Sequence, residues 1–138
     1  MPDRAMRPVP PASKGQMLWR GCTKRCPRCG GGHLFHRWFE IVDDCPTCGL
    51  HFEREEGYWA GALAINIGFV AAVFAVALVV ALAFTVPDVP VAEILAVLIP
   101  LVIVVPIVFY PFSKTIWMAV DRALLQHMDP REHLDEQT

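Results

Sequence analysis

The sequence predicts an all-α membrane protein in which two transmembrane helices form a hairpin, preceded by a small β-type domain and followed by an amphipathic helix. Two observations predict this fold. The apolar residues of the 138-residue chain gather between Tyr58 and Phe112, whereas most charged residues lie on either side. Four cysteines, arranged as two short pairs, precede the apolar region. This layout is typical of a membrane protein and unlike that of a soluble core.

Residues 1–15 form an arm that we expect to be disordered, because it contains four prolines and no apolar run. For the same reason it is not a signal peptide. Positive residues without acids extend from Arg4 to Arg37, and acidic residues dominate from Glu40 to Glu56. The soluble part is therefore a basic segment followed by an acidic neck. The net charge of −2 by itself favours neither nucleic acids nor acidic molecules as partners.

The cysteines of residues 16–57 have the spacing of a four-thiolate zinc site, with 15 residues between the two Cys-x2-Cys pairs. In each pair a proline follows the first cysteine and a glycine follows the second, which suits a tight turn beneath a metal ion. We therefore expect a cytoplasmic zinc ribbon with a short strand pair at residues 33–42, closed around a structural zinc ion. The predicted ligands are Cys26, Cys29, Cys45 and Cys48.

Other interpretations of the cysteines are less favoured. Disulfides are disfavoured in the reducing cytoplasm, and iron is the less favoured metal for four thiolates. Cys22 is left over in a basic setting, which would suit a reactive or redox-sensing thiol, although a spare cysteine is more often incidental. Three histidines lie near enough in sequence to replace a ligand, but we expect them to be surface or packing residues: His33, His36 and His51.

The first transmembrane helix is predicted at residues 58–86, which include 28 consecutive uncharged residues from Trp59 to Val86. We expect a stripe of small residues on it to contact the second helix. Asn66 then points away from the hairpin, toward another protein or a second copy, unless its amide is held by its own helix or lies near the membrane interface. The stripe consists of Gly57, Gly61, Ala64, Gly68, Ala72 and Ala75.

The second transmembrane helix is predicted at residues 94–112, a run of 19 uncharged residues. Three prolines interrupt it, and each frees the carbonyl four residues earlier. In lipid these carbonyls need partners, which predicts a kinked helix packed against protein; the alternative is that prolines are simply common in membrane helices. The prolines are Pro100, Pro106 and Pro111, and the freed carbonyls are those of Ala96, Val102 and Ile107.

The flanking charges predict the topology. The short extracytoplasmic link at residues 87–93 contains no Lys or Arg, whereas positive residues flank the other ends of both spans. The positive-inside rule therefore places both termini in the cytoplasm. Residues 113–138 are predicted to be a cytoplasmic amphipathic helix and tail, in which the helix either lies along the membrane surface or continues the second span. The expected apolar face consists of Ile116, Trp117, Val120, Leu124 and Met128.

The segments CPRCGGGHLF, CPTCGL, FEREEGYWAGALAINIGF and SKTIWMAVD together resemble the bacterial membrane family catalogued as domain of unknown function 983. The similarity extends from Gly21 to Leu125, which is most of the chain. It implies a small integral protein of the bacterial cytoplasmic membrane with an N-terminal cysteine-pair motif. Genes of this family sometimes lie near those for haem-copper oxidase assembly, which by association suggests a respiratory oxidase as the partner complex.

These observations predict a non-enzymatic accessory or assembly subunit, embedded in the lipid bilayer and docked to an integral membrane protein or to a second copy of itself. The chain shows no nucleophile with its base, phosphate loop or haem site. An acidic group that includes Glu53, Glu55 and Glu56 lies beside His51, but such a run is usually a solvated surface.

Two alternatives to this function were weighed. The first is nucleic-acid binding, with the basic residues on phosphates and aromatic residues stacking on bases. The same basic residues already serve to orient the chain and to contact anionic lipid, which makes nucleic acid the less favoured partner. The second is a thiol or metal sensor that uses Cys22. The residues of the first alternative are Arg20, Lys24, Arg25 and Arg28, with Trp19, Phe35 or Trp38.

Overall fold

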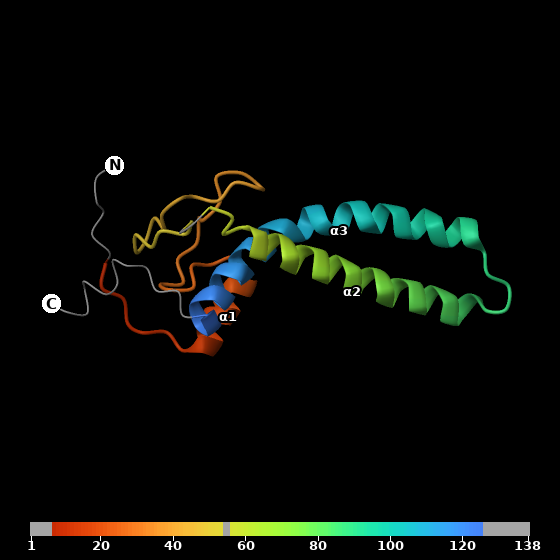
Figure 1. The fold of residues 1–138 in the computed structure, drawn as a ribbon, viewed down its shortest axis with the longest axis horizontal. Helices are drawn as coiled ribbons and strands as arrows, with labels where there is room; N and C mark the ends of the chain where they lie inside the picture. The colour runs from red at the N-terminus through yellow and green to blue at the C-terminus, as the bar shows by residue number, and fades with distance from the viewer. Residues whose placement is uncertain (1–6, 54–55, 126–138) are drawn as a thin grey trace.

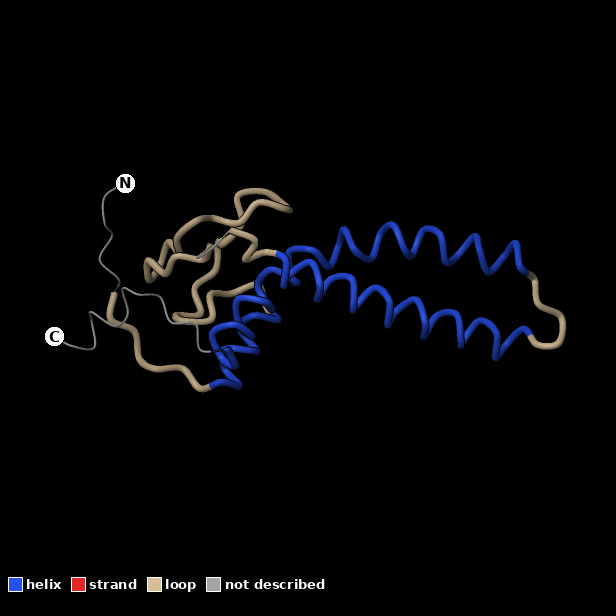
Figure 2. Tube along the Cα trace, in the orientation of Figure 1, coloured by secondary structure: helices blue, strands red, loops and turns tan. Residues whose placement is uncertain are grey.

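The computed structural model describes residues 7–53 and 56–125. They form helices α1 (Lys14–Cys22), α2 (Ala60–Thr85) and α3 (Val91–Val120), and α3 continues into a π-helical turn, η1 (Asp121–Leu125). Helices α2 and α3 lie side by side as a long antiparallel hairpin (Figure 1). The cysteine domain, residues 23–53, lies at the end of the hairpin opposite the connecting turn and is built of loops and turns (Figure 2).

The two hairpin helices are long and apolar enough to cross a membrane. Their 26 and 30 residues correspond to about 39 Å and 45 Å, against roughly 30 Å of bilayer hydrocarbon. Hardly any of their apolar surface is covered by protein: Val79, Phe84 and Val97 are 65%, 86% and 65% exposed. A helix in a soluble core would bury such side chains, so lipid is the environment that suits this surface.

The face of α2 that contacts α3 matches the predicted stripe only in part: Gly61 packs against the Trp117 ring of α3, but other stripe residues do not lie at the contact. Asn66 is buried at the helix contact, and its Nδ2 donates a hydrogen bond to the carbonyl of Pro106 at 3.3 Å. Gly68 has no atom within 4 Å of where a Cβ would stand, and the stripe residues Ala64, Ala72 and Ala75 are exposed. The predicted outward orientation of Asn66 was therefore wrong, because an amide in lipid gains more from a carbonyl partner than small residues gain from close approach.

Helix α3 does not break at the end of the predicted second span. It runs through all three prolines to Val120, and its axis bends toward α1 in the C-terminal part (Figure 1). The expected amphipathic helix at residues 113–125 is the continuation of this helix. The face it buries is not the expected apolar one: Lys114 and Asp121 are buried while Leu124 is 58% exposed. Protein, not lipid, covers this part of α3, and Met128 and the tail lie outside the described residues.

The protein that covers the end of α3 is α1, which the sequence analysis did not anticipate. Ser13 caps α1 by accepting from the backbone N–H of Gln16, while the Gln16 side chain accepts from the backbone N–H of Ser13. Gly21 is buried where the two helices cross, and Thr115 Oγ1 of α3 donates to its carbonyl at 2.7 Å. A Cβ at Gly21 would stand only 2.8 Å from the Thr115 carbonyl oxygen, so only glycine permits this close crossing.

Two further expectations differ from the structure. In the described residues the predicted strand pair is reduced to isolated antiparallel bridges between Phe35 and Ile41 and between Asp44 and His51, so a β-type ribbon is not confirmed. The turn at residues 36–40 leaves too few residues on either side for a ladder. The described part of the arm, expected to be disordered, instead follows the cysteine domain: Arg7 donates its N–H to the Cys48 carbonyl at 3.2 Å.

Candidate metal centre

The structure brings the four predicted ligands, Cys26, Cys29, Cys45 and Cys48, into one cluster in which all four Sγ atoms lie within 4.8 Å of one another. The Sγ atoms of Cys26 and Cys48 are 3.8 Å apart, and those of Cys29 and Cys45 are 3.6 Å apart. A tetrahedron of sulfurs at the usual zinc–sulfur distance has edges of about 3.8 Å. The cluster therefore has the size of a four-thiolate metal site.

The two cysteine turns have the same backbone hydrogen bonds. In the first, the N–H of Cys26 donates to the Gly31 carbonyl at 2.9 Å and the N–H of Gly30 donates to the Cys26 carbonyl at 2.8 Å. The second turn repeats both bonds, starting from Cys45 and Gly49. The glycines have φ of +75° and +78°, a conformation that other residues rarely adopt. The glycine after each pair is therefore required by the turn that brings the two thiols together.

Most of the site is shielded from solvent. Cys26, Cys45 and Cys48 are at most 1% exposed, whereas Cys29 is half-buried. The backbone N–H of Gly31 points at Cys29 Sγ at 3.3 Å, a bond that stabilises a thiolate. Three apolar residues pack against the cluster and form the small core of the domain: Leu34, Leu50 and Phe52. Four thiol ligands leave no open coordination position on a tetrahedral metal, which favours a structural metal over a catalytic one.

The thiols influence one another's ionisation. Hydrogen bonds with Cys45 and Cys48, followed by burial, raise the pKa of the Cys26 thiol far above its usual value. Hydrogen bonds with Cys26 and Cys48 lower the pKa of Cys45. Four thiolates at this separation require a divalent cation, and zinc would supply the charge and the tetrahedral geometry.

Two arginines are positioned against the cysteine turns. Arg20 of α1 donates from Nη1 to the carbonyls of Pro27 and Arg28, at 3.3 and 2.9 Å. Arg28 donates from Nη1 to the Cys48 carbonyl at 3.4 Å, which links the first turn to the second. A divalent ion with four thiolates has a net charge of −2, and these two guanidinium groups would balance it.

The remaining candidate residues lie outside the cluster. Cys22 is exposed at the end of α1, and His33 and His36 are exposed on the cysteine domain. His51 pairs through Nδ1 with Asp44 Oδ1 at 2.9 Å, so no described histidine joins the metal ligands. In the acidic neck Glu53 and Glu56 are exposed, while Arg54 and Glu55 lie outside the described residues.

The cysteine domain is attached to α3 by polar contacts that sequence reasoning missed. Trp38 Nε1 donates to the Ile107 carbonyl at 2.8 Å. This carbonyl was expected to need a partner because Pro111 has no N–H, and the partner is a tryptophan far away in sequence. Lys114 Nζ donates to the Phe39 carbonyl at 2.8 Å. One turn of the cysteine domain thus supplies both contacts. The sequence indicated only one of them, because Pro111 left the Ile107 carbonyl in need of a partner.

The comparisons with known proteins identify the family. No curated protein and no solved structure matches the chain. A family model described as "Protein of unknown function (DUF983)" matches residues 35–121, which include the second cysteine pair, both hairpin helices and the buried end of α3. The first pair, Cys26 and Cys29, lies just before the matched region. Because the match extends over more than half of the chain, this protein belongs to the DUF983 family.

Proposed function

We propose that the protein is a non-enzymatic accessory or assembly subunit of a membrane complex, in which one structural zinc ion folds the cysteine domain and the hairpin spans the cytoplasmic membrane. The observation that carries the proposal is the closed four-cysteine cluster attached directly to a membrane-type helix. The ion would hold the domain in shape, and the Trp38 and Lys114 contacts would hold the domain against α3.

The fold supports the proposed topology. The cysteine domain and the C-terminal end of α3 lie at the same end of the hairpin, and the turn between α2 and α3 lies at the other (Figure 1). A protein of this shape with two spans would keep both charged regions on one side of the membrane. Lys and Arg occur in those regions and are absent from the link between the spans, which favours the cytoplasmic side for the charged regions.

The outward face of α2 supports docking. The small residues Ala64, Gly68 and Ala72 are exposed to the surroundings of the hairpin, and a Cβ at Gly68 would meet no atom within 4 Å. Small residues allow the backbone of another membrane helix to approach closely. We therefore place the partner, another integral membrane protein or a second copy, on this face. A respiratory oxidase complex is suggested only by the resemblance to the family.

The test is purification of the tagged full-length protein from native membranes in mild detergent, with metal analysis of the same sample. We expect about one zinc per chain and a co-purifying membrane protein or a dimer. Gly68→Phe should abolish co-purification, whereas Val76→Phe, on an exposed neighbouring face, should retain it. A lone monomer, or equal co-purification with both variants, would disprove docking through this face.

The structure disfavours the nucleic-acid alternative. Arg20 and Arg28 are engaged with backbone carbonyls of the cysteine domain. Lys24 lies 5.2 Å from the centre of the Trp38 ring and 4.8 Å from that of Phe112. Three of the four cations proposed to contact phosphates, and one of the proposed stacking residues, thus have contacts within the protein. The Cys22 sensor keeps an exposed thiol, but no second feature points to it.

A further inference from the structure

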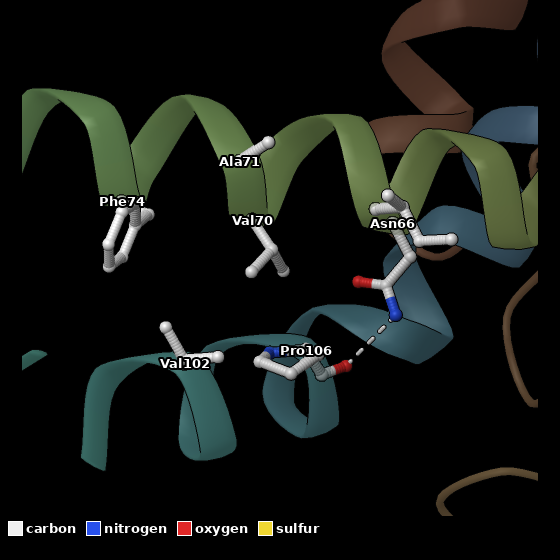
Figure 3. Close-up of a pocket in the computed structure, with 7 residues that line it drawn as sticks. Asn66, Val70, Ala71, Phe74, Val102 and Pro106 are labelled. Atoms are coloured by element: carbon white, nitrogen blue, oxygen red, sulfur yellow. Dashed lines mark hydrogen bonds between the residues drawn. The ribbon is translucent and has the colours of Figure 1, made fainter. Parts of the chain in front are cut away.

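A groove of about 440 Å³ opens between α2 and α3 in the half of the hairpin nearest the cysteine domain (Figure 3). Val70 and Phe74 of α2 form one wall, and Val102 and Pro106 of α3 form the other. The volume is in the range of small-molecule sites. Because these side chains belong to the two membrane-type helices, the groove would open to lipid and not to water.

One polar side chain interrupts the apolar lining. Asn66 is only 6% exposed, and its Nδ2 is used by the hydrogen bond to the Pro106 carbonyl. Its Oδ1 is buried and accepts no hydrogen bond from any described residue, and Figure 3 shows it on the side of the amide that faces the groove. An amide oxygen in an apolar environment is stabilised by a donor, which this groove does not supply.

A second acceptor belongs to Val102, which also lines the groove. Residue 106 is a proline, so the carbonyl of Val102 lacks the N–H that would normally bond to it in a helix. The carbonyl freed in the same way at Ile107 accepts from Trp38 Nε1, which shows how this helix satisfies such a group when a donor is near. The residues of the groove therefore include two acceptors, Asn66 Oδ1 and the Val102 carbonyl, and their one side-chain donor group is Asn66 Nδ2, which already gives one N–H to Pro106.

We propose that this groove binds a small apolar molecule that carries one hydroxyl group. The hydroxyl would lie between Asn66 Oδ1 and the Val102 carbonyl, and the apolar body would lie along Val70 and Phe74 toward the middle of the hairpin. Asn66 follows Ala60 by six residues, which places the hydroxyl about 9 Å along α2 from the end nearest the cysteine domain. Plain acyl chains have no donor for these acceptors, and a charged donor would be costly in hydrocarbon.

The test uses the full-length protein in phosphatidylcholine nanodiscs, with hexadecanol bearing a photoreactive diazirine as the probe and its methyl ether as the matched control. On irradiation the alcohol should label peptides containing residues 66–74 and 102–106. The ether cannot donate, so at equal concentration its labelling should be roughly tenfold weaker, corresponding to the loss of one hydrogen bond in an apolar site. Asn66→Leu should reduce labelling by the alcohol toward that of the ether.

Two neighbouring positions separate a filled groove from a damaged protein. Ala71 lines the groove, so Ala71→Phe should fill it and block labelling. The adjacent Ala72 is exposed outside the groove, so Ala72→Phe should leave labelling unchanged. Equal labelling by alcohol and ether, or labelling that survives Ala71→Phe, would overturn the proposal. It would also be overturned if a photoreactive amino acid in place of Ala71 captured a second copy of the chain, because the groove would then be a helix interface.

Discussion

The cysteine domain and the hairpin reach stability by opposite means. The domain has no described strand and only a few buried apolar side chains, and its organising feature is a cluster of four thiols. The hairpin consists of helices that satisfy most of their own backbone groups, apart from the carbonyls freed by the prolines of α3, but expose most of their apolar surface. Each half would therefore depend on something outside the chain, a cation for the domain and a bilayer for the hairpin.

Removing one thiol should break the domain and spare the hairpin. Cys26→Ser removes a fully buried ligand, so the protein should lose its zinc, whose binding contributes on the order of 10 kcal/mol to folding in comparable sites. We expect rapid proteolysis within residues 23–53 while circular dichroism still reports the α2–α3 helices. Cys22→Ser is the control and should keep both metal and protection. Retention of zinc by Cys26→Ser would show that the cluster is not the metal site.

Chelation should produce the same separation without mutation. In the zinc-bound protein a maleimide should react only with Cys22, the exposed cysteine, and after chelation it should react with all five cysteines. Intact-mass spectrometry counts the adducts. Equal labelling before and after chelation would indicate that no metal protects the cluster.

The α1–α3 crossing tests how closely the two halves must fit. Gly21→Ala places a methyl group against the backbone of Thr115 and should destabilise the protein by about 1–3 kcal/mol, because overpacked contacts force backbone shifts. Gly15→Ala in the same helix meets no atom within 4 Å and should stabilise α1 by up to about 1 kcal/mol. Thermal unfolding in detergent measures both. A Gly21→Ala protein as stable as the wild type would show that the crossing is looser than described.

A local effect is expected at the tryptophan contact between the cysteine domain and α3. Trp38→Phe removes the donor to the Ile107 carbonyl and should cost about 1–3 kcal/mol, measured as faster hydrogen exchange in residues 34–41. Pro111→Ala returns an N–H to that carbonyl, so Trp38→Phe should cost less in this background. Trp19→Phe, at a residue that is 71% exposed, is the control. Equal costs in both backgrounds would exclude the proposed coupling.

The features predicted correctly were those that depend on residues close together in the sequence. The uncharged runs coincide with α2 and most of α3, and the four cysteines meet because the proline and glycine of each pair determine the turn. The inward face of α2 could not be predicted in the same way. This helix is apolar all round, so no polar side marks the outside, and the small residues suggested the wrong face.

The wrong predictions for α1 and for the C-terminal end of α3 have a different cause. The cap of α1, Ser13 with Gln16, is a recognisable start signal that was overlooked in a proline-rich arm. Ser113, Lys114 and Asp121 resemble surface residues, but the structure buries them beneath α1 and the cysteine domain. Burial of polar residues by a distant segment is a tertiary effect, and helical periodicity carries no information about it.

The buried position of Lys114 has a consequence for the membrane around the protein. A lysine at the end of a transmembrane helix usually extends its ammonium group to follow the lipid headgroups. Here the Nζ atom is bonded to the Phe39 carbonyl and lies 4.9 Å and 5.1 Å from the ring centres of Trp59 and Tyr110, so it has no freedom to follow them. A bilayer of different thickness must adapt to the protein, at a cost of fractions of a kcal/mol per Å of mismatch. The fixed lysine would therefore set how deeply this end of α3 lies in the bilayer, and the chain would favour membranes of one thickness.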